Sequence, residues 1–166
     1  GMPGAHFIAA TNPNDTIPRY MESRNYDPKP AVPTLSNAMD VADPSNFVRI
    51  RELFKNDFPK LAAKLSAYSY TDAQTLEAIQ TLFQSYAYIA DPHGAVGYLG
   101  LVKYLEAHPH HTGIFLETAH PIKFRETVET CLDRELELPL QIQGLLDREK
   151  VFSDISTYEE LREALR

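Results

Sequence analysis

The stretch Gly113–Phe124, GIFLETAHPIKF, changes within a few residues from an apolar segment to polar residues and then to a segment led by proline. Thr112 to Leu116 predicts a buried strand, and Pro121 to Leu132 predicts a helix with proline near its start. Tyr86 to Ala90, YAYIA, is a second short apolar segment, and it also precedes a helix start, at Asp91-Pro92-His93. Short strands that alternate with helices predict an α/β fold, with helices layered on a short, mostly parallel sheet.

The rest of the chain adds one more predicted strand and several helices. His6 to Ala10, HFIAA, predicts a strand that ends in a turn. Further helix starts are expected at Pro44 with Asp43 as its N-cap, at Thr71 or Asp72, and, after an irregular tail, at Ser156 or Thr157. Three short strands make a thin sheet for so many helices. We therefore expect one α/β unit over 1–166, with a core over 6–139 and a tail over 140–166, that forms part of a larger protein.

Composition excludes several classes of protein. The 166 residues carry a formal net charge of -7, which argues against nucleic-acid binding. A single cysteine, Cys131, excludes an intrachain disulfide and favours a reducing, cytoplasmic location. The chain shows no signal-peptide pattern, and no apolar run approaches the roughly 20 residues that cross a membrane.

Two motifs that could suggest a ligand are better explained without one. Three histidines in four positions, His108, His110 and His111, lack the further ligands of a closed metal site, so a solvated loop is favoured and no metal is expected. Gly94, Gly97 and Gly100 do not have the spacing of a phosphate-binding glycine loop, and close packing against a neighbouring segment is favoured.

Other polar stretches leave two interpretations open. The residues Ser36, Asn37, Asn46 and Arg49 suit a phosphate or carboxylate near a helix N-terminus, or simply a capped helix with a solvated arginine. His93 and His120 both stand beside a proline where an apolar segment meets a helix. That is where α/β proteins bind ligands, but the helix-capping interpretation, with Asp91 and Thr118 as caps, is favoured.

Four motifs together resemble one family. IAATNPNDTIPRY, TLSNAMDVADPSNFVRI, DPHGAVGY and LETAHPIKF, in this order and spacing, are similar to the C-terminal part of the threonine synthases, from about His6 to about Pro139. The resemblance implies the tryptophan-synthase-β-like fold, also called pyridoxal phosphate fold type II. It also implies pyridoxal phosphate as cofactor and conversion of O-phospho-L-homoserine and water into threonine and phosphate.

The resemblance also implies roles for individual residues. Thr118, in the TAHP motif, would contact the pyridine nitrogen of the cofactor, and Ala119 would leave the approach open. A hydroxyl can bond this nitrogen without forcing a full positive charge on the ring. The SNAMD and PSNFVR segments of the second motif resemble those that line the substrate side in the family, which implies that Ser36, Asn37, Asn46 and Arg49 bind the phosphorylated substrate. The roles of His93 and His120 stay open.

One departure from the family limits what this chain is expected to do alone. The family holds its cofactor as a Schiff base on a lysine in a motif like AFKDF, which this sequence lacks, and the glycine- and asparagine-rich phosphate loop is also absent. We therefore expect a C-terminal part of the enzyme that carries no catalytic lysine, binds no cofactor by itself and is inactive alone. The alternative is a non-catalytic α/β binding or interaction module derived from that enzyme.

A divided sheet also predicts self-association. An unpaired strand edge and uncovered helix faces would be buried by a second copy, most simply in a two-fold dimer. The faces expected to be exposed are those with Phe47, Ile50 and Phe54, or with Leu76, Ile79 and Phe83.

Overall fold

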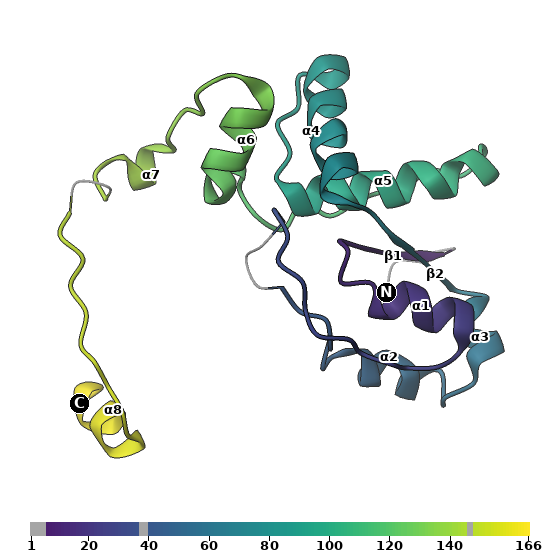
Figure 1. The fold of residues 1–166 in the computed structure, drawn as a ribbon, viewed down its shortest axis with the longest axis horizontal. Coiled ribbons are helices and arrows are strands. Elements are labelled where there is room, and N and C mark those ends of the chain that lie inside the picture. Colours follow the sequence, from purple (N-terminus) through teal and green to yellow (C-terminus); the bar gives the residue numbers. More distant parts are fainter. Residues whose placement is uncertain (1–5, 37–39, 146–147) are drawn as a thin grey trace. The chain divides into compact units, whose positions relative to one another are not determined.

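The computed structural model describes residues 6–36, 40–145 and 148–166 (Figure 1). Two compact units are present, Gly1–Leu136 and Glu137–Arg166, and each is described by itself. The division expected from the sequence, into a core over 6–139 and a tail over 140–166, stays a prediction.

The first unit contains a small parallel sheet with helices on both faces. β1 (Phe7–Thr11) pairs in parallel with β2 (Leu65–Ser69), with Phe7 opposite Leu65 and Thr11 opposite Ser69. β1 confirms the strand expected near His6–Ala10, whereas β2 was not predicted. α1 covers one face of the sheet and α5 the other (Figure 1). The α/β class and the parallel sheet are thus confirmed.

The crossover between the two strands carries three helices, α1 (Thr16–Ser23), α2 (Phe47–Leu53) and α3 (Phe58–Ala62). Phe47 is 3% exposed and packs with the α1 residues Ile17 and Tyr20. The prediction that the Phe47 face lies exposed is therefore wrong for that residue, because α1 and the loop after it cover it.

The start of α2 also differs from the prediction. The helix begins at Phe47 with Asn46 at the N-cap position, not at Pro44 with Asp43 as cap. The Asp43 carboxylate instead accepts a hydrogen bond from the Tyr26 hydroxyl at 2.8 Å. The side chain that would have capped the helix is thus engaged with the preceding loop.

α4 (Asp72–Tyr86) and α5 (Pro92–Ala107) form the second core of this unit. Both predicted caps are confirmed: Thr71 forms a capping box with Gln74, and Asp91 accepts from the backbone N–H of His93. Ile79 is fully buried against α5. The prediction of an exposed face at this position is wrong, because the close approach of α5 covers it.

Two predicted strands are absent from the described structure. α4 continues to Tyr86 and ends at Ala87 with a left-handed φ of 53°, so Tyr86–Ala90 is no buried strand, and Tyr86 is 66% exposed. Residues 112–116 form no strand either, and Ile114 and Leu116 are each 74% exposed. A strand requires a neighbour that accepts and donates its backbone hydrogen bonds, and no described segment pairs with residues 112–116.

The predicted helix at Pro121–Leu132 is present, with a tighter first turn. η1 (Pro121–Phe124) is a 3-10 turn that leads into α6 (Arg125–Leu132). His120 occupies the N-cap position, where its Nδ1 accepts from the Ile122 N–H at 3.1 Å. The side chain that begins this helix is therefore His120 and not Thr118.

The second unit contains α7 (Leu140–Gln143) and α8 (Tyr158–Ala164). Thr157 caps α8 in a capping box with Glu160, which confirms one of the two expected caps. The tail expected to be irregular thus includes one short helix, α7. Among the described residues of the whole chain, no helix is long and apolar enough to cross a membrane.

Candidate functional site

A polar network lies directly beyond the carboxyl end of β1, and Asp40 is its centre. Asp40 Oδ1 accepts from Thr34 Oγ1 at 2.7 Å, from Asn14 Nδ2 at 3.3 Å and from Asn12 Nδ2 at 3.4 Å. Asp40 Oδ2 accepts from the Thr34 N–H at 3.1 Å, and Asn12 Nδ2 also donates to Ser36 Oγ at 3.0 Å. Ligands of α/β proteins gather at this end of a parallel sheet.

The same network ties down the proline-rich loop. Asn14 Nδ2 donates to the Val32 carbonyl at 3.0 Å, while Asn14 Oδ1 accepts from the Val32 N–H at 2.9 Å. Asp72 at the start of α4 accepts from the Leu35 N–H at 3.3 Å. The network therefore joins the end of β1, the loop and α4. In the sequence, Asn12 and Asn14 belong to the turn expected after His6–Ala10, and their place directly after a strand is the signal that could have indicated this network.

The structure separates the predicted substrate-binding residues into two groups. Ser36 is 3% exposed and belongs to the network, and Asn37 lies outside the described residues. Asn46 and Arg49 are exposed at α2, where the Asn46 carbonyl accepts from the Arg49 N–H at 3.1 Å. Nothing in the described residues joins Asn46 or Arg49 to the network around Asp40. All four assignments stay predictions.

The segment that carries Thr118 lies along α5. Alternate residues of this segment meet the helix: Gly113 lies against Leu101, Phe115 against Gly97 and Glu117 against Gly94. On a neighbouring face of α5, a Cβ on Gly100 would meet Ala10 Cβ of β1 at 2.8 Å. The expected close-packing role is confirmed for Gly94 and Gly100, where a Cβ would overlap the segment or β1, whereas a Cβ on Gly97 would make only an ordinary contact of 3.7 Å with Phe115 Cβ.

Glu117 and Asp91 form a buried carboxyl pair at the first turn of α5. Glu117 Oε1 accepts from the Asp91 N–H at 2.9 Å, and Asp91 Oδ1 accepts from the His93 N–H at 2.7 Å and pairs with His93 Nδ1 at 2.9 Å. Burial and the neighbouring Asp91 carboxyl raise the pKa of Glu117 to about 7. Burial opposes ionisation of Asp91 too, but hydrogen bonds from His93 and Glu117 outweigh it and hold the pKa of Asp91 below its ordinary value.

Thr118 follows this pair with its side chain exposed. Its hydroxyl has no hydrogen-bond partner among the described residues, so it is free to bind a ligand, and the small side chain of Ala119 is half-buried beside it. A free hydroxyl next to a small residue fits the ring nitrogen of pyridoxal phosphate. Asp91 therefore caps its helix as expected, whereas Thr118 does not cap the next one. The ring of His93 makes a hydrogen bond to the capping carboxylate of Asp91.

Comparison with known proteins bears on the nature of this site. The family described as threonine synthase, C-terminal, matches residues 94–165. The chain is 48% identical to threonine synthase of Haemophilus influenzae over 139 residues, which are 84% of this chain and 32% of the relative. It is 42% identical to threonine synthase of Escherichia coli over 147 residues, 89% of this chain and 33% of the relative.

Solved structures agree with the sequence matches. The crystal structure of the Escherichia coli threonine synthase matches with a TM-score of 0.84 at 37% identity, over 99% of this chain and 38% of that one. This chain is thus similar to the C-terminal part of threonine synthases. A threonine synthase from Brucella melitensis with pyridoxal phosphate bound matches with a TM-score of 0.78 at 26% identity, over 99% of this chain and 40% of that one. These matches confirm the fold type II expectation.

The chain spans about a third of the length of the curated threonine synthases that it matches. These 166 residues contain no stretch like AFKDF, the motif in which the resemblance places the Schiff-base lysine.

The histidine-rich loop packs more closely than expected. His108 stacks on Tyr104 with ring centroids 4.1 Å apart, and His111 Nδ1 lies 3.1 Å from the Tyr104 hydroxyl. Within the residues that the structure describes, no cluster of histidine, cysteine or carboxylate side chains could hold a metal ion. The loop is thus part of a small aromatic stack at the end of α5.

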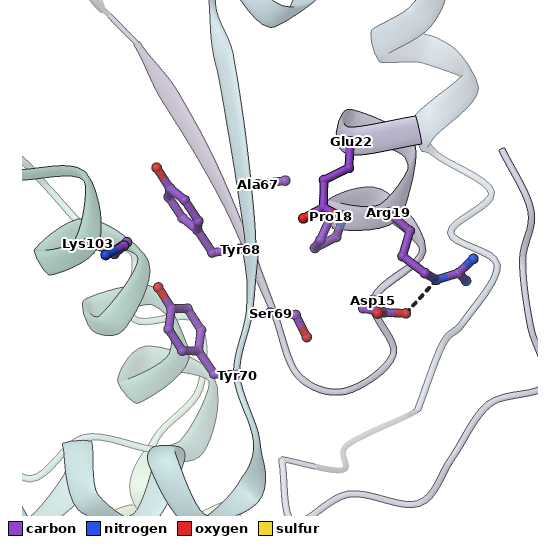
Figure 2. Close-up of a pocket in the computed structure, with 9 residues that line it drawn as sticks. All are labelled: Asp15, Pro18, Arg19, Glu22, Ala67, Tyr68, Ser69, Tyr70 and Lys103. Atoms are coloured by element: carbon purple, nitrogen blue, oxygen red, sulfur yellow. Dashed lines mark hydrogen bonds and ion pairs between the residues drawn. The ribbon is translucent and has the colours of Figure 1, made fainter. Parts of the chain in front are cut away.

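A hollow of about 350 Å³ lies at β2, and no predicted site residue lines it. Figure 2 shows Tyr68 and Tyr70 pointing toward α5 and Lys103, while Ala67 lies toward Pro18 and Glu22 of α1. Arg19 and Asp15, which also line it, form an ion pair of 2.8 Å. The hollow lies at β2, and in the described structure only β1 pairs with this strand, so its other edge is unpaired. An unpaired strand edge favours pairing with another chain.

Proposed function

We propose that this chain is the C-terminal part of a threonine synthase that converts O-phospho-L-homoserine and water into L-threonine and phosphate with pyridoxal phosphate. The observation that carries the proposal is Thr118, whose exposed hydroxyl is unbonded among the described residues and lies in the TAHP motif of a chain similar to threonine synthases. This similarity supports the reaction class, and the free hydroxyl supports the role of Thr118.

The cofactor, when bound, supplies an electron sink for chemistry at the substrate carbons. Thr118 would hold the ring nitrogen by a hydrogen bond, and Ala119 would leave room beside the ring. Ser36, Asn37, Asn46 and Arg49 are proposed to bind the phosphorylated substrate. Ser36 is held in place by Asn12, whose Nδ2 donates to Ser36 Oγ at 3.0 Å.

By itself the chain is expected to be inactive and to bind no cofactor at a specific lysine. A non-catalytic interaction module derived from the enzyme is the alternative. A cytoplasmic location and a self-associated dimer belong to the same proposal. Ile114 and Leu116, both exposed, give such a dimer an apolar surface different from the helix faces expected from the sequence.

A chimera tests this function. We expect Escherichia coli threonine synthase whose matched C-terminal part is replaced by this chain to release phosphate from O-phospho-L-homoserine when pyridoxal phosphate is present. This chain alone, at the same concentration, is expected to release none. After borohydride reduction, mass spectrometry should find the cofactor on a lysine of the Escherichia coli part. A folded but inactive chimera, or stoichiometric labelling of one lysine in this chain alone, would contradict the proposal.

Within the chimera, Thr118→Ala should lower turnover about 5- to 150-fold. The loss of one hydrogen bond at a desolvated site costs roughly 1–3 kcal/mol, and about 1.4 kcal/mol corresponds to a factor of ten in rate. Thr112→Ala is the matched control, since Thr112 is an exposed threonine on the same segment. Steady-state kinetics and cofactor absorbance check the result. Equal turnover in the two variants would remove Thr118 from the cofactor site.

A further inference from the structure

We propose that Glu117 is a positioning residue that clamps the segment carrying Thr118 and Ala119 to the first turn of α5 through Asp91. The inference rests on the proposed function in one respect, that Thr118 is the cofactor contact. Glu117 itself touches neither cofactor nor substrate in this proposal. It acts through the residue that follows it.

The clamp is visible in the geometry. Glu117 Oε1 accepts from the Asp91 N–H at 2.9 Å, and the segment leaves this anchor directly at Thr118. Gly94 provides the space, because a Cβ at this position would overlap Glu117 Oε2. On the far side of Thr118, His120 begins the next turn through its bond to the Ile122 N–H. Thr118 and Ala119 are thus the two residues between two fixed side chains.

The remaining carboxyl oxygens show how the clamp is held together. Asp91 Oδ2 and Glu117 Oε2 are both buried, and neither has a hydrogen-bond donor in the described structure. Two ionised carboxylates could only repel each other here, whereas one proton turns the pair into a hydrogen bond. Asp91 is the ionised partner, because its Oδ1 accepts from the His93 N–H and also pairs with His93 Nδ1, whereas Glu117 accepts only from the Asp91 N–H among the described residues. Glu117 therefore carries the proton.

The clamp should consequently depend on pH. The ionisable groups that bear on Glu117 are Asp91, the N-cap of α5, His93 of α5, and Tyr88 of the preceding segment. Since the pKa of Glu117 is raised to about 7, the pair holds one proton below that pH. Above it, both groups are charged and the clamp loosens. Its contribution to stability is fully present below the ordinary glutamate pKa and is lost as pH rises through about 7.

Nuclear magnetic resonance of this chain, between pH 5 and pH 9 without cofactor, tests the clamp. The amide and methyl signals of Thr118 should shift with a midpoint near 7, the value to which the pKa of Glu117 is raised. In Glu117→Gln, which mimics the protonated acid, the Thr118 signals should stay at their acidic positions across the whole range. In Glu117→Ala, the Thr118 amide should be mobile on the nanosecond timescale at every pH. The control is Glu126→Gln, an exposed glutamate in the first turn of α6, which should titrate as the unaltered chain does.

Two results would overturn the clamp. One is a Thr118 titration in Glu117→Gln identical to that of the unaltered chain, because the shift would then belong to His93 or another group. The other is a Thr118 amide in Glu117→Ala as ordered as in the unaltered chain, with Ile79 signals showing that the core is folded. If Glu117→Ala does not fold, the Glu117→Gln titration alone decides. None of these measurements uses the cofactor. The clamp can therefore be confirmed when the chimera is inactive, and it can be refuted when the chimera is active.

Discussion

Asp40→Ala is expected to destabilise the unit Gly1–Leu136 by about 3 kcal/mol or more. Its carboxylate accepts hydrogen bonds from Asn12, Asn14 and both the hydroxyl and the N–H of Thr34. Removal of this one acceptor takes a partner from the Thr34 N–H, the Thr34 hydroxyl and Asn14 Nδ2, although Asn14 Nδ2 keeps the Val32 carbonyl and Asn12 Nδ2 keeps Ser36 Oγ. Each buried unsatisfied donor costs roughly 1–3 kcal/mol. Water that enters the gap would bond some of these donors, so the total destabilisation is smaller than the sum of the separate penalties.

Urea denaturation followed by circular dichroism at pH 7 measures the effect. Asp43→Ala is the matched control, since Asp43 lies in the same loop region, is exposed and accepts one hydrogen bond from Tyr26. That change should cost at most about 1 kcal/mol. Asp40→Asn should fall between the two, because the amide keeps one oxygen acceptor but turns an NH₂ group toward one of the donors. Equal costs for the Asp40→Ala and Asp43→Ala variants would show that the network does not hold the loop.

Under the proposed function, in which Ser36 binds the phosphorylated substrate, the network matters because Asn12 Nδ2 holds Ser36 Oγ at 3.0 Å. In the chimera, Asp40→Asn should therefore raise the Michaelis constant for O-phospho-L-homoserine more than it lowers turnover, as expected when a residue supports substrate binding. This pattern differs from that of Thr118→Ala, which should act mainly on turnover.

Local signals in the sequence predicted the helix starts well. Thr71, Asp91 and Thr157 each cap a helix as expected, because a cap needs only a short polar side chain and the backbone N–H groups two or three residues later. Asp43 has the same local pattern but fails as a cap. Its carboxylate bonds Tyr26, 17 residues away in the sequence, and such a contact leaves no trace in local spacing.

Strands were predicted less well, because pairing partners decide them. The segment 112–116 has strand-like alternation of exposure but no strand beside it in the described structure, whereas β2, LSAYS, is a strand because β1 lies next to it. Apolar content alone favoured the first and missed the second.

The candidate site also has one part that a local motif predicts and one part that depends on contacts between distant residues. The resemblance of the TAHP motif predicted Thr118 as the cofactor contact, and this role stays a prediction. The Asp40 network and the Glu117–Asp91 pair join residues up to 37 and 26 positions apart, so only the folded chain reveals them.

Gly94→Ala should destabilise the chain when residue 117 is glutamate and stabilise it in the Glu117→Ala variant. In the unaltered chain the added methyl group would overlap Glu117 Oε2. The glutamate must then leave its place, which breaks the bond to the Asp91 N–H and separates the carboxyl pair. Alanine is intrinsically better than glycine in a helix by about 1 kcal/mol. The loss of the buried hydrogen bonds outweighs this gain, and we expect a net destabilisation of about 2 kcal/mol at pH 6.

In the Glu117→Ala background the three side-chain atoms nearest to the added methyl group are absent, so Gly94→Ala should stabilise the protein by up to about 1 kcal/mol. The coupling energy of the double-mutant cycle is then about 3 kcal/mol, at the upper end for residues in direct contact. Gly97→Ala is the control on the same helix, because a Cβ there meets Phe115 Cβ at an ordinary 3.7 Å and should behave alike in both backgrounds. The coupling energy should also be smaller at pH 8.5, because ionisation of Glu117 has already loosened the clamp at that pH. A coupling near zero at pH 6 would mean that the glutamate leaves its place without cost. In that case Gly94 is simply a close-packing glycine, and Thr118 is held by the peptide chain and His120 alone.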